Sequence, residues 1–456
     1  MTTVTVYGLG VAGVATARAF ASRGHGVRLG DDTLTDSMSA LADEIDSPLH
    51  SALDAQGIEA VLRGSDVLVP APGIAPTHPV ITEALRRGVV VRSEIDVAYE
   101  WEQARTGGPR PIIAVTGTDG KTTTTMLVGA LLRGSGVTCA EVGNTDVPFI
   151  AALEDDVDAF VVECSSFRLA YTVAFRANAS IWLNIAPDHL DWHGSFENYA
   201  STKARIWSHV RSADIAIVPN GDTLIGGYAN SHDHRVRTFG LASGDYRSDA
   251  GNLVGPTGPF ANTSSMWRAM PHDISNSLAA SAAVIECGLV DVGTIDASLA
   301  TFRPASHRID HVGDFAGSGW YDDSKATSPH AALTAVRAFD RVVLIAGGKN
   351  KDLDLSDLAS EPQRMHGVVA IGASQDDVVH AFSGVCDVVR ADSMEAAVRA
   401  AATLTAPGVA VLLSPGCTSY DWYTNYKERG DDFVRHVLRH FSTSTEQLNT
   451  SGGGNP

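Results

Sequence analysis

The sequence predicts an α/β protein of three domains, and three observations support this prediction. Short apolar runs rich in β-branched residues alternate with longer helical patterns through most of the chain, which is typical of parallel sheets covered by helices. The length of 456 residues corresponds to about three domains of ordinary size. A linker-like stretch at 106–111 and the end of a helical pattern near 302–305 interrupt the alternation. We therefore expect domains at residues 1–107, 108–304 and 305–456.

The first domain is expected to be Rossmann-like, with strands at 4–7, 27–29, 67–69 and 89–91. Its first strand is followed by the glycine pattern G-x-G-x-x-G from Gly8 to Gly13, which indicates a nucleotide phosphate site. The next strand ends in Asp31 and Asp32, where an acid would meet a ribose hydroxyl, and Gly73 follows a further strand on the same side. Two alternatives stay open here: an NAD site, and glycines that serve only the packing of a helix on a strand.

The central domain is expected to be of the P-loop ATPase type. Strands are predicted at 112–116, 137–142, 159–163, 181–185 and 215–218, with loops and short antiparallel strands at 245–270. After the first of these strands the run Gly117-Thr118-Asp119-Gly120-Lys121-Thr122-Thr123 opens a helix. Backbone N–H groups, the helix N-terminus, the Lys121 charge and the Thr122 hydroxyl can together hold a polyphosphate and Mg²⁺. The loop is shorter than G-x-x-x-x-G-K-[ST], because Val115 stands where that pattern has its first glycine.

Further polar side chains follow other strands of the central domain. Glu163 ends one strand and His189 follows another, and both suggest chemistry at a metal and a phosphate, with Glu163 the more natural Mg²⁺ ligand. Asp188, Asp191 and His193 are interpreted as a solvated loop. From its spacing alone, Lys203 is an ordinary exposed helical lysine.

The third domain is also expected to be Rossmann-like, with strands at 342–346, 368–371, 385–389 and 409–413. Arg308 can bind a carboxylate or phosphate, Lys325 can neutralise a substrate carboxylate, and Asp323 can bind a ribose or orient the lysine. Glycine-bearing strand ends at 347–351 and 414–421 add donors at the same edge, which favours a small polar ligand. The tail is predicted to be disordered from about residue 442.

Charge and composition exclude several classes of partner. Lys and Arg number 34 against 53 Asp and Glu, a net charge of −19, so we expect no binding to nucleic acid or to membranes. The five scattered cysteines indicate neither a disulfide framework nor a zinc site. No signal peptide is recognised and no uncharged run approaches membrane-spanning length. We expect a cytoplasmic monomer.

Taken together, these residues resemble the Mur ligases over nearly the whole chain. Gly-Thr-x-Gly-Lys-Thr-Thr at 117–123, Glu-x-Ser-Ser-Phe at 163–167, Asn-Ile-x-x-Asp-His-Leu-Asp at 184–191 and Lys-x-Arg-Ile at 203–206 are similar to the family's ATPase core. Asp-Ser-Lys-Ala-Thr at 323–327 and Leu-Ser-Pro at 413–415, followed by Ser419 and Asp421, are similar to the members that add D-glutamate. Ligases that add a third residue and folylpolyglutamate synthases differ at 323–327.

The resemblance implies ATP-dependent amide formation in peptidoglycan precursor synthesis. The carboxylate of UDP-N-acetylmuramoyl-L-alanine would attack the γ-phosphate of ATP, and the amine of D-glutamate would attack the resulting acyl phosphate. The implied catalytic residues are Lys121, Glu163, His189 and Lys203. The resemblance also implies two Mg²⁺ ions. Their implied ligands are Thr122, Glu163, His189 and Lys203, the last in carbamylated form. The implied ATP contacts are Gly117, Thr118, Asp119, Gly120, Lys121, Thr122, Thr123, Asn276, Arg308 and Asp323. The implied contacts of the uridine-linked substrate are Gly13, Asp31, Gly73 and Asn144; Asn144 is alternatively a residue beside the metal. The implied contacts of D-glutamate are Lys325, Thr327, Lys351, Ser419 and Tyr426.

Five positions depart from the family pattern: Asp119, Asp273 and Ser328 each replace a usual Asn, Arg168 replaces a Gln, and Tyr426 replaces a Phe. Because a carboxylate aimed at ATP would oppose its binding, we expect Asp119 to point away from the phosphates or to contact Mg²⁺ or a cation. Three alternatives are kept: a related ligase for another nucleotide-linked or polyglutamyl substrate, an ATP-binding scaffold without chemistry, and an NAD oxidoreductase.

Overall fold

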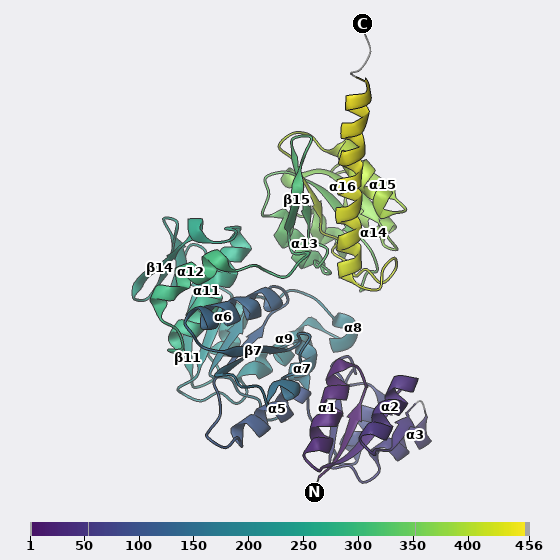
Figure 1. The fold of residues 1–456 in the computed structure, drawn as a ribbon, viewed down its shortest axis with the longest axis vertical. Helices are drawn as coiled ribbons and strands as arrows, with labels where there is room; N and C mark the ends of the chain where they lie inside the picture. The colour runs from purple at the N-terminus through teal and green to yellow at the C-terminus, as the bar shows by residue number, and fades with distance from the viewer. Residues whose placement is uncertain (1, 53, 352, 452–456) are drawn as a thin grey trace. The chain divides into compact units, whose positions relative to one another are not determined.

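A computed structural model of the protein describes residues 2–52, 54–351 and 353–451 (Figure 1). The chain forms two compact units, the first made of Met1–Ile185 and Trp192–Arg303 and the second of Ala186–Asp191 and Pro304–Pro456. In the described part of the chain each of three sheets is built from one of the three predicted segments. The α/β class is therefore confirmed, and the domain boundaries at 107 and 304 stay a prediction.

The first sheet has five parallel strands in the order β3-β2-β1-β4-β5. The order reverses at β1 and β4, and in sheets of this kind ligands bind outside the carboxyl ends of the strands at such a point. The elements are β1 (Thr3–Tyr7), α1 (Val11–Ser22), β2 (Gly26–Asp31), α2 (Asp36–Glu44), β3 (Leu49–Ser51), α3 (Ala55–Leu62), β4 (Val67–Pro70), α4 (Pro79–Arg86), β5 (Val90–Val91) and α5 (Glu94–Gln103).

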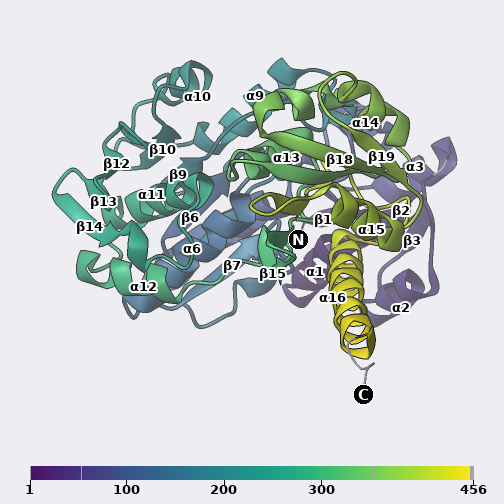
Figure 2. The same cartoon turned by 90° about the horizontal axis from the view of Figure 1, so that it is seen from above.

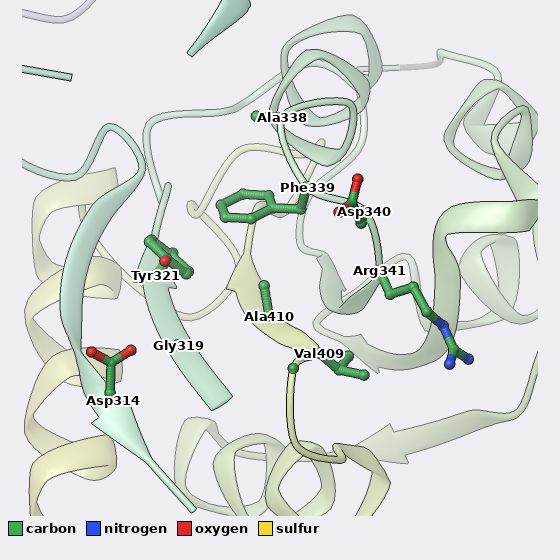
Figure 3. Close-up of a pocket in the computed structure, with 10 residues that line it drawn as sticks. Asp314, Gly319, Tyr321, Ala338, Phe339, Asp340, Arg341, Val409 and Ala410 are labelled. Atoms are coloured by element: carbon green, nitrogen blue, oxygen red, sulfur yellow. The ribbon is translucent and has the colours of Figure 1, made fainter. Parts of the chain in front are cut away.

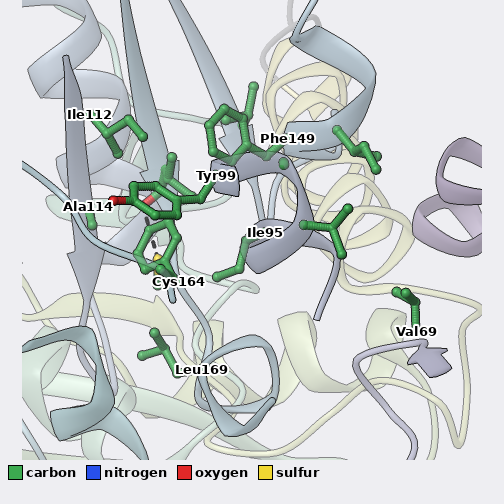
Figure 4. Close-up of a cluster of buried hydrophobic side chains, with 14 of the residues drawn as sticks. Val69, Ile95, Tyr99, Ile112, Ala114, Phe149, Cys164 and Leu169 are labelled. Atoms are coloured by element: carbon green, nitrogen blue, oxygen red, sulfur yellow. Dashed lines mark hydrogen bonds between the residues drawn. The ribbon is translucent and has the colours of Figure 1, made fainter. Parts of the chain in front are cut away.

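Helix α5 attaches the first sheet to the rest of the first unit. Its Asp96 is fully buried, and Oδ1 accepts hydrogen bonds from three consecutive backbone N–H groups, those of residues 173 to 175, over 2.7–2.9 Å. Apolar side chains continue this contact, because Val69 of β4, Ile95 and Tyr99 of α5 and Leu169 belong to one buried cluster (Figure 4). Removing a cluster of this size from water stabilises the unit as one body.

The second sheet has nine strands in the order β14-β13-β12-β11-β10-β9-β6-β8-β7. It is parallel from β7 to β12, and β13 and β14 add an antiparallel edge, as the composition of 245–270 predicts. The elements are β6 (Ile112–Thr116), α6 (Lys121–Gly134), β7 (Cys139–Gly143), η1 (Phe149–Ala152), β8 (Ala159–Glu163), α7 (Ser166–Ala170), β9 (Ala179–Trp182), α8 (Leu190–His193), α9 (Phe196–Ala204), η2 (Arg205–Trp207), β10 (Ile215–Pro219), α10 (Thr223–Ala229), β11 (Arg235–Gly240), β12 (Tyr246–Asp249), β13 (Asn252–Gly255), β14 (Gly258–Asn262), η3 (Thr263–Ser265), α11 (Pro271–Glu286), η4 (Val292–Thr294) and α12 (Ile295–Thr301).

Helices α6 and α11 lie side by side on one face of this sheet (Figure 2). Leu127 and Leu131 of α6 and Leu278 of α11 are buried in one cluster with Ile113 and Val115 of β6. This packing places the N-terminus of α11 near the loop that joins β6 to α6.

The third sheet has six strands in the order β15-β16-β20-β17-β18-β19, and only the β15–β16 pair is antiparallel. The elements are β15 (Asp310–Phe315), β16 (Ser318–Asp322), α13 (Pro329–Val336), β17 (Val342–Gly347), η5 (Leu355–Ala359), η6 (Pro362–Arg364), β18 (Met365–Ile371), α14 (Gln375–Ala381), β19 (Val388–Ala391), α15 (Met394–Leu404), β20 (Ala410–Leu413) and α16 (Tyr426–Ser451).

Helix α16 differs from the prediction for the tail, because it continues to Ser451 where disorder was expected from about residue 442. Its first part is fixed by Phe433 and Val437, which are buried against the third sheet. Each further helical residue then adds one hydrogen bond to an existing helix, which is easier than nucleation. Residues 452–456 of the predicted tail lie outside the described residues. Within the described residues we find no helix long and apolar enough to span a membrane.

Candidate functional site

The loop between β6 and α6 has the backbone geometry of a phosphate cradle. Gly120 is the N-cap of α6 and has a left-handed conformation with φ +81°, which side chains other than glycine adopt at a cost. A Cβ atom at this position would also lie 3.0 Å from Asn276 Oδ1. The loop thus requires glycine here, and α6 points its free N–H groups and its positive end at the loop.

Asn184 braces this loop from the end of β9. Its Oδ1 accepts hydrogen bonds from the backbone N–H groups of Thr118 (3.0 Å) and Asp119 (2.9 Å), and its Nδ2 donates to Asp119 O (3.1 Å). The sequence placed Asn184 in a motif but gave it no role. Its position directly after an apolar strand was the available signal.

Two lysines converge on one backbone oxygen of the loop. Lys121 Nζ donates to Gly117 O (2.9 Å) and Thr118 O (2.8 Å), and Lys203 Nζ donates to Gly117 O (2.8 Å). Lys203 is 1% exposed and its Nζ lies 4.6 Å from the centre of the Tyr199 ring. The interpretation of Lys203 as an exposed lysine, made from spacing alone, is therefore wrong, and the structure brings it beside Lys121.

Glu163 presents an anionic oxygen without a partner. The residue is 2% exposed, Oε1 accepts a hydrogen bond from Asn144 Nδ2 (2.9 Å), and Oε2 has no hydrogen-bond partner in the described part of the chain. A buried carboxylate oxygen in this state fits Mg²⁺, which prefers oxygen ligands. The described residues contain no group of three or more His, Cys, Asp or Glu side chains that could hold a metal ion.

The N-terminal part of α11 lies next to the phosphate loop in the first unit. Asn276 is 8% exposed and lies against Gly120, as described above. Asp273 is 1% exposed and forms a two-point ion pair with Arg268, Nε to Oδ2 over 2.6 Å and Nη2 to Oδ1 over 2.9 Å. Thr122 and Thr123 lie in the first turn of α6, and Thr123 is buried.

Three of the four residues predicted for the uridine-linked substrate belong to the region of the first sheet, whereas Asn144 follows β7 of the second sheet. Asp31 Oδ2 accepts a hydrogen bond from Leu9 N (2.8 Å) and so closes the glycine loop after β1. A Cβ atom at Gly13 would lie 2.1 Å from Gly8 O, which shows that this glycine is needed for helix packing. Gly73 O accepts a hydrogen bond from Trp192 Nε1 (3.2 Å).

In the second unit, Arg308 lies on a turn with unusual backbone. Its neighbours His307 (φ +65°) and Ile309 (φ +51°) are both left-handed, a conformation that is rare for a β-branched residue and that points to a constrained turn. His307 Nδ1 lies 2.6 Å from Asp322 Oδ2, and this hydrogen bond and the Asp322 charge raise the pKa of His307. Asp323 is buried and accepts a hydrogen bond from Ser414 Oγ (2.7 Å), and burial raises the pKa of its carboxyl to about 7.

The residues predicted for D-glutamate lie at the carboxyl ends of β16, β17 and β20. Lys325 Nζ is 5.5 Å from the centre of the Tyr426 ring, and Ser419 is buried. Arg429, which the sequence analysis missed, is 1% exposed and donates to Ser324 Oγ (2.9 Å), Ser324 O (2.8 Å) and Cys417 O (3.1 Å). Burial lowers the pKa of its guanidinium to about 10. Arg429 thus joins α16 to the loop that contains Ser324 and to the loop that contains Cys417. In the sequence, the one available sign of this role was an arginine near the start of the last helix. Thr327 is half-buried.

Segment 186–191 groups with the second unit and carries His189. Asp188, predicted to be solvated, is 6% exposed; its Oδ1 lies 3.2 Å from Lys351 Nζ and its Oδ2 lies 3.2 Å from His189 Nε2. His193, in the first unit, is 7% exposed and its Nε2 lies 2.9 Å from Ser166 Oγ. The loop interpretation is wrong for both residues, because tertiary partners bury them, whereas Asp191 is exposed as expected.

Two departures from the family pattern have local explanations. Arg168 forms an ion pair with the buried Glu94 of α5, which also accepts a hydrogen bond from Ile150 N (2.6 Å). Ser328 is the N-cap of α13 and accepts a hydrogen bond from Ala331 N (3.3 Å). Both side chains stabilise the fold through polar partners of their own.

A hollow of about 340 Å³ lies at the opposite edge of the third sheet, where β17 and β20 begin (Figure 3). Tyr321 and Phe339 form its aromatic wall, with ring centroids 4.7 Å apart. It contains none of the predicted site residues, so it lies away from the carboxyl edge that Arg308, Asp323 and Lys325 occupy.

Comparisons with known proteins match three successive segments of the chain. Three family descriptions match: "Mur ligase MurD-like, N-terminal domain" at residues 2–93, "Mur ligase middle domain" at 115–284 and "Mur ligase, glutamate ligase domain" at 307–417. A UDP-N-acetylmuramoylalanine--D-glutamate ligase of Frankia casuarinae is 37% identical over 95% of this chain and 93% of its own length. The ligase of the same name from Streptomyces coelicolor is 35% identical over 95% of this chain and 97% of its own length.

Solved structures agree with the fold. MurF of Acinetobacter baumannii has a TM-score of 0.61 at 18% identity and covers 91% of this chain and 92% of its own. UDP-N-acetylmuramate-alanine ligase MurC of Thermotoga maritima has a TM-score of 0.59 at 17% identity and covers 97% of this chain and 100% of its own. MurF of Thermotoga maritima, solved with ADP, has a TM-score of 0.58 at 19% identity and covers 84% of this chain and 95% of its own.

Proposed function

This chain belongs to the Mur ligase family, and from that premise we propose that it joins D-glutamate to the L-alanyl carboxylate of UDP-N-acetylmuramoyl-L-alanine. The reaction converts ATP to ADP and phosphate and extends a peptidoglycan precursor. The relatives that carry this activity in their names match over nearly the whole chain, and the segment 323–327 keeps the residues of the D-glutamate-adding members. The NAD alternative loses its support, because the glycine loop of the first sheet belongs to a ligase.

Two observations carry the site assignment: lysine side chains held at the phosphate loop, and one buried carboxylate oxygen of Glu163 that has no hydrogen-bond partner among the described residues. Lys121 Nζ and Lys203 Nζ both lie within 2.9 Å of Gly117 O, so Lys121 brings a positive charge to the phosphate loop and Lys203 places a modifiable amine beside it. In the described part of the chain Glu163 Oε2 is buried without a hydrogen-bond partner; it would hold Mg²⁺ together with Thr122, and His189 is a further candidate ligand. Mg²⁺, when bound, neutralises the charge that develops during phosphoryl transfer.

The reaction requires that a poor acyl donor be activated and then kept from water. The substrate carboxylate attacks the γ-phosphate and ADP leaves; the D-glutamate amine then attacks the acyl phosphate and phosphate leaves. The residues of this chain bind and orient: Lys121 holds the transferring phosphate, and Arg308 and Asp323 hold the nucleotide. Catalysis by such positioning and charge neutralisation needs no covalent intermediate on the protein.

We further propose that Lys203 is carbamylated in the active enzyme and so supports a second Mg²⁺. Burial at 1% exposure makes a permanent ammonium costly, and carbamylation replaces that charge with an anionic oxygen ligand. We expect the intact mass of gently prepared protein to carry one CO₂ adduct that K203A lacks. Full activity in K203A, or an adduct on another lysine, contradicts this proposal.

The substrate sites are proposed from the resemblance to the family. D-Glutamate lies between Lys325, Thr327, Lys351, Ser419 and Tyr426, and the uridine-linked substrate contacts Gly13, Asp31, Gly73 and Asn144. We propose a cytoplasmic monomer.

One assay tests the function. Phosphate release is measured with ATP, Mg²⁺ and UDP-N-acetylmuramoyl-L-alanine, and D-glutamate, L-lysine or diaminopimelate is added in turn. Release that requires D-glutamate supports the proposal. Equal release with L-lysine or diaminopimelate contradicts the specificity, and no release with any amino acid favours a scaffold that has lost its chemistry.

A further inference from the structure

The N-terminal turn of α11 carries a buried acid beside the phosphate loop. Asn276 of this helix lies against Gly120, the N-cap of α6. Asp273 precedes Asn276 by three residues, so both side chains lie on the same face of the helix. Asp273 is 1% exposed. A bare carboxylate here would repel the polyphosphate that the loop is built to bind.

Arg268 neutralises the Asp273 carboxylate through two hydrogen bonds of fixed geometry. The two-point ion pair described above joins Nε and Nη2 of Arg268 to the two oxygens of Asp273, and His272 Nε2 lies 3.3 Å from Oδ1. A fork-shaped guanidinium on a carboxylate is the strongest and most specific form of such a pair. The Arg268 side chain is 18% exposed and that of Asp273 is 1% exposed, so the acid is covered and the cation is partly accessible.

We propose that Arg268 is a positioning residue of the nucleotide site: it neutralises the charge of Asp273 and fixes the first turn of α11. This proposal rests on the proposed ATP site, and specifically on Asn276 as an ATP contact. It assigns no direct contact between Arg268 and ATP. Its consequence is that the two residues are coupled, and that Arg268 matters for ATP only while Asp273 is present.

The test is a double-mutant cycle of R268Q and D273N, in which the KM values for ATP and D-glutamate are measured separately. Removing one partner of a buried charge pair leaves the other unpaired, so R268Q should raise the KM for ATP by about tenfold or more while the KM for D-glutamate changes by less than about twofold. D273N/R268Q should return to within about threefold of the wild-type KM for ATP. R237Q is the matched control, because Arg237 binds Glu286 at the other end of α11 over 2.7 Å; it should leave the KM for ATP unchanged.

Each other outcome overturns the proposal. An unchanged KM for ATP in R268Q, or equal effects on both substrates together with a lower melting temperature, identifies a merely structural pair. If R268Q does not fold, the comparison of D273N with D273N/R268Q decides: a tenfold loss on removing Arg268 in the D273N background means that Arg268 contacts ATP itself. N276A distinguishes an error in the placement of the nucleotide site from an error in the role of Arg268. If N276A leaves the KM for ATP unchanged, the nucleotide site is wrongly placed; if N276A raises it and R268Q does not, only the role of Arg268 fails.

Discussion

Replacing Asp323 by Asn is expected to stabilise the ligand-free protein at neutral and alkaline pH, and to change its stability much less in acid. Asp323 is 4% exposed at the end of β16. Burial raises its pKa to about 7, although the hydrogen bond from Ser414 and the charge of Arg308 act in the opposite direction. The folded protein therefore keeps a proton on this carboxyl at pH values where the unfolded chain has lost it.

The sign and the size of the effect follow from this difference. Between the ordinary value of 3.8 and about 7 the folded state binds more protons, so the free energy of unfolding decreases as the pH rises, by about 1.4 kcal/mol for each pH unit. Below the unfolded-state pKa of 3.8 the carboxyl is protonated in both states and its stabilising contribution is fully present. By the folded-state pKa of about 7, the free energy of unfolding has fallen by about 4 kcal/mol. Above that pH both states are ionised and the loss is constant. Asn has no charge to bury, so D323N lacks this dependence.

Hydrogen exchange of the β16 and β20 amides, corrected for intrinsic exchange rates, measures the opening free energy of the second unit. The stabilisation of D323N over wild type should be about 2–3 kcal/mol larger near pH 8 than near pH 5. D340N is the control for substitution of an exposed acid in the same unit, and a pH effect shared by D340N and D323N would not be specific to the buried position. Equal stabilisation by D323N at both pH values would refute the reasoning, since it would mean that Asp323 does not titrate between them.

Three further substitutions test other contacts. E163Q removes the unpartnered anionic oxygen and should lower Mg²⁺-dependent phosphate release by about 100-fold or more, with an unchanged or higher melting temperature; substantial remaining activity would exclude Glu163 as the metal ligand. D119N should leave activity similar or higher, because Asn removes a negative charge from the phosphate loop, and a large loss in steady-state rate would mean that this chain uses the acid. R168Q leaves the buried Glu94 without its cation and should cost about 3–5 kcal/mol in urea unfolding, most of it recovered in R168Q/E94Q; equal stability of R168Q and wild type would contradict the pairing.

Strand ends were the part of the site that could be predicted well from sequence. Apolar runs identify buried parallel strands, and polar residues that follow them must lie at the carboxyl edge of the sheet. Glu163, Gly120 and Asp323 were found by this reasoning, and the structure places each at such an edge. The strand order within each sheet was not predicted, because hydrophobic periodicity does not encode which strands pair.

Residues whose role depends on distant partners were interpreted wrongly or missed. Lys203 and Asp188 read as exposed polar residues because burial by tertiary contacts leaves no local pattern. Arg429 was missed for the same reason, since its partners Ser324 and Cys417 come from other loops. Arg268 and Asp273 lie five residues apart, and only the structure shows that they form an ion pair.

The hydrogen bonds of Lys121 and Lys203 to the Gly117 carbonyl order both side chains before any ligand binds to the loop. Both long lysine side chains are already held on one peptide oxygen, so the rotamer entropy of each, about 1.5–2 kcal/mol, is lost when the chain folds and not when ATP arrives. An incoming phosphate exchanges one oxygen acceptor for another and orders nothing new. A neutral ligand offers the Lys121 ammonium no better partner than the carbonyl oxygens it already holds, so the resting contact itself favours anions.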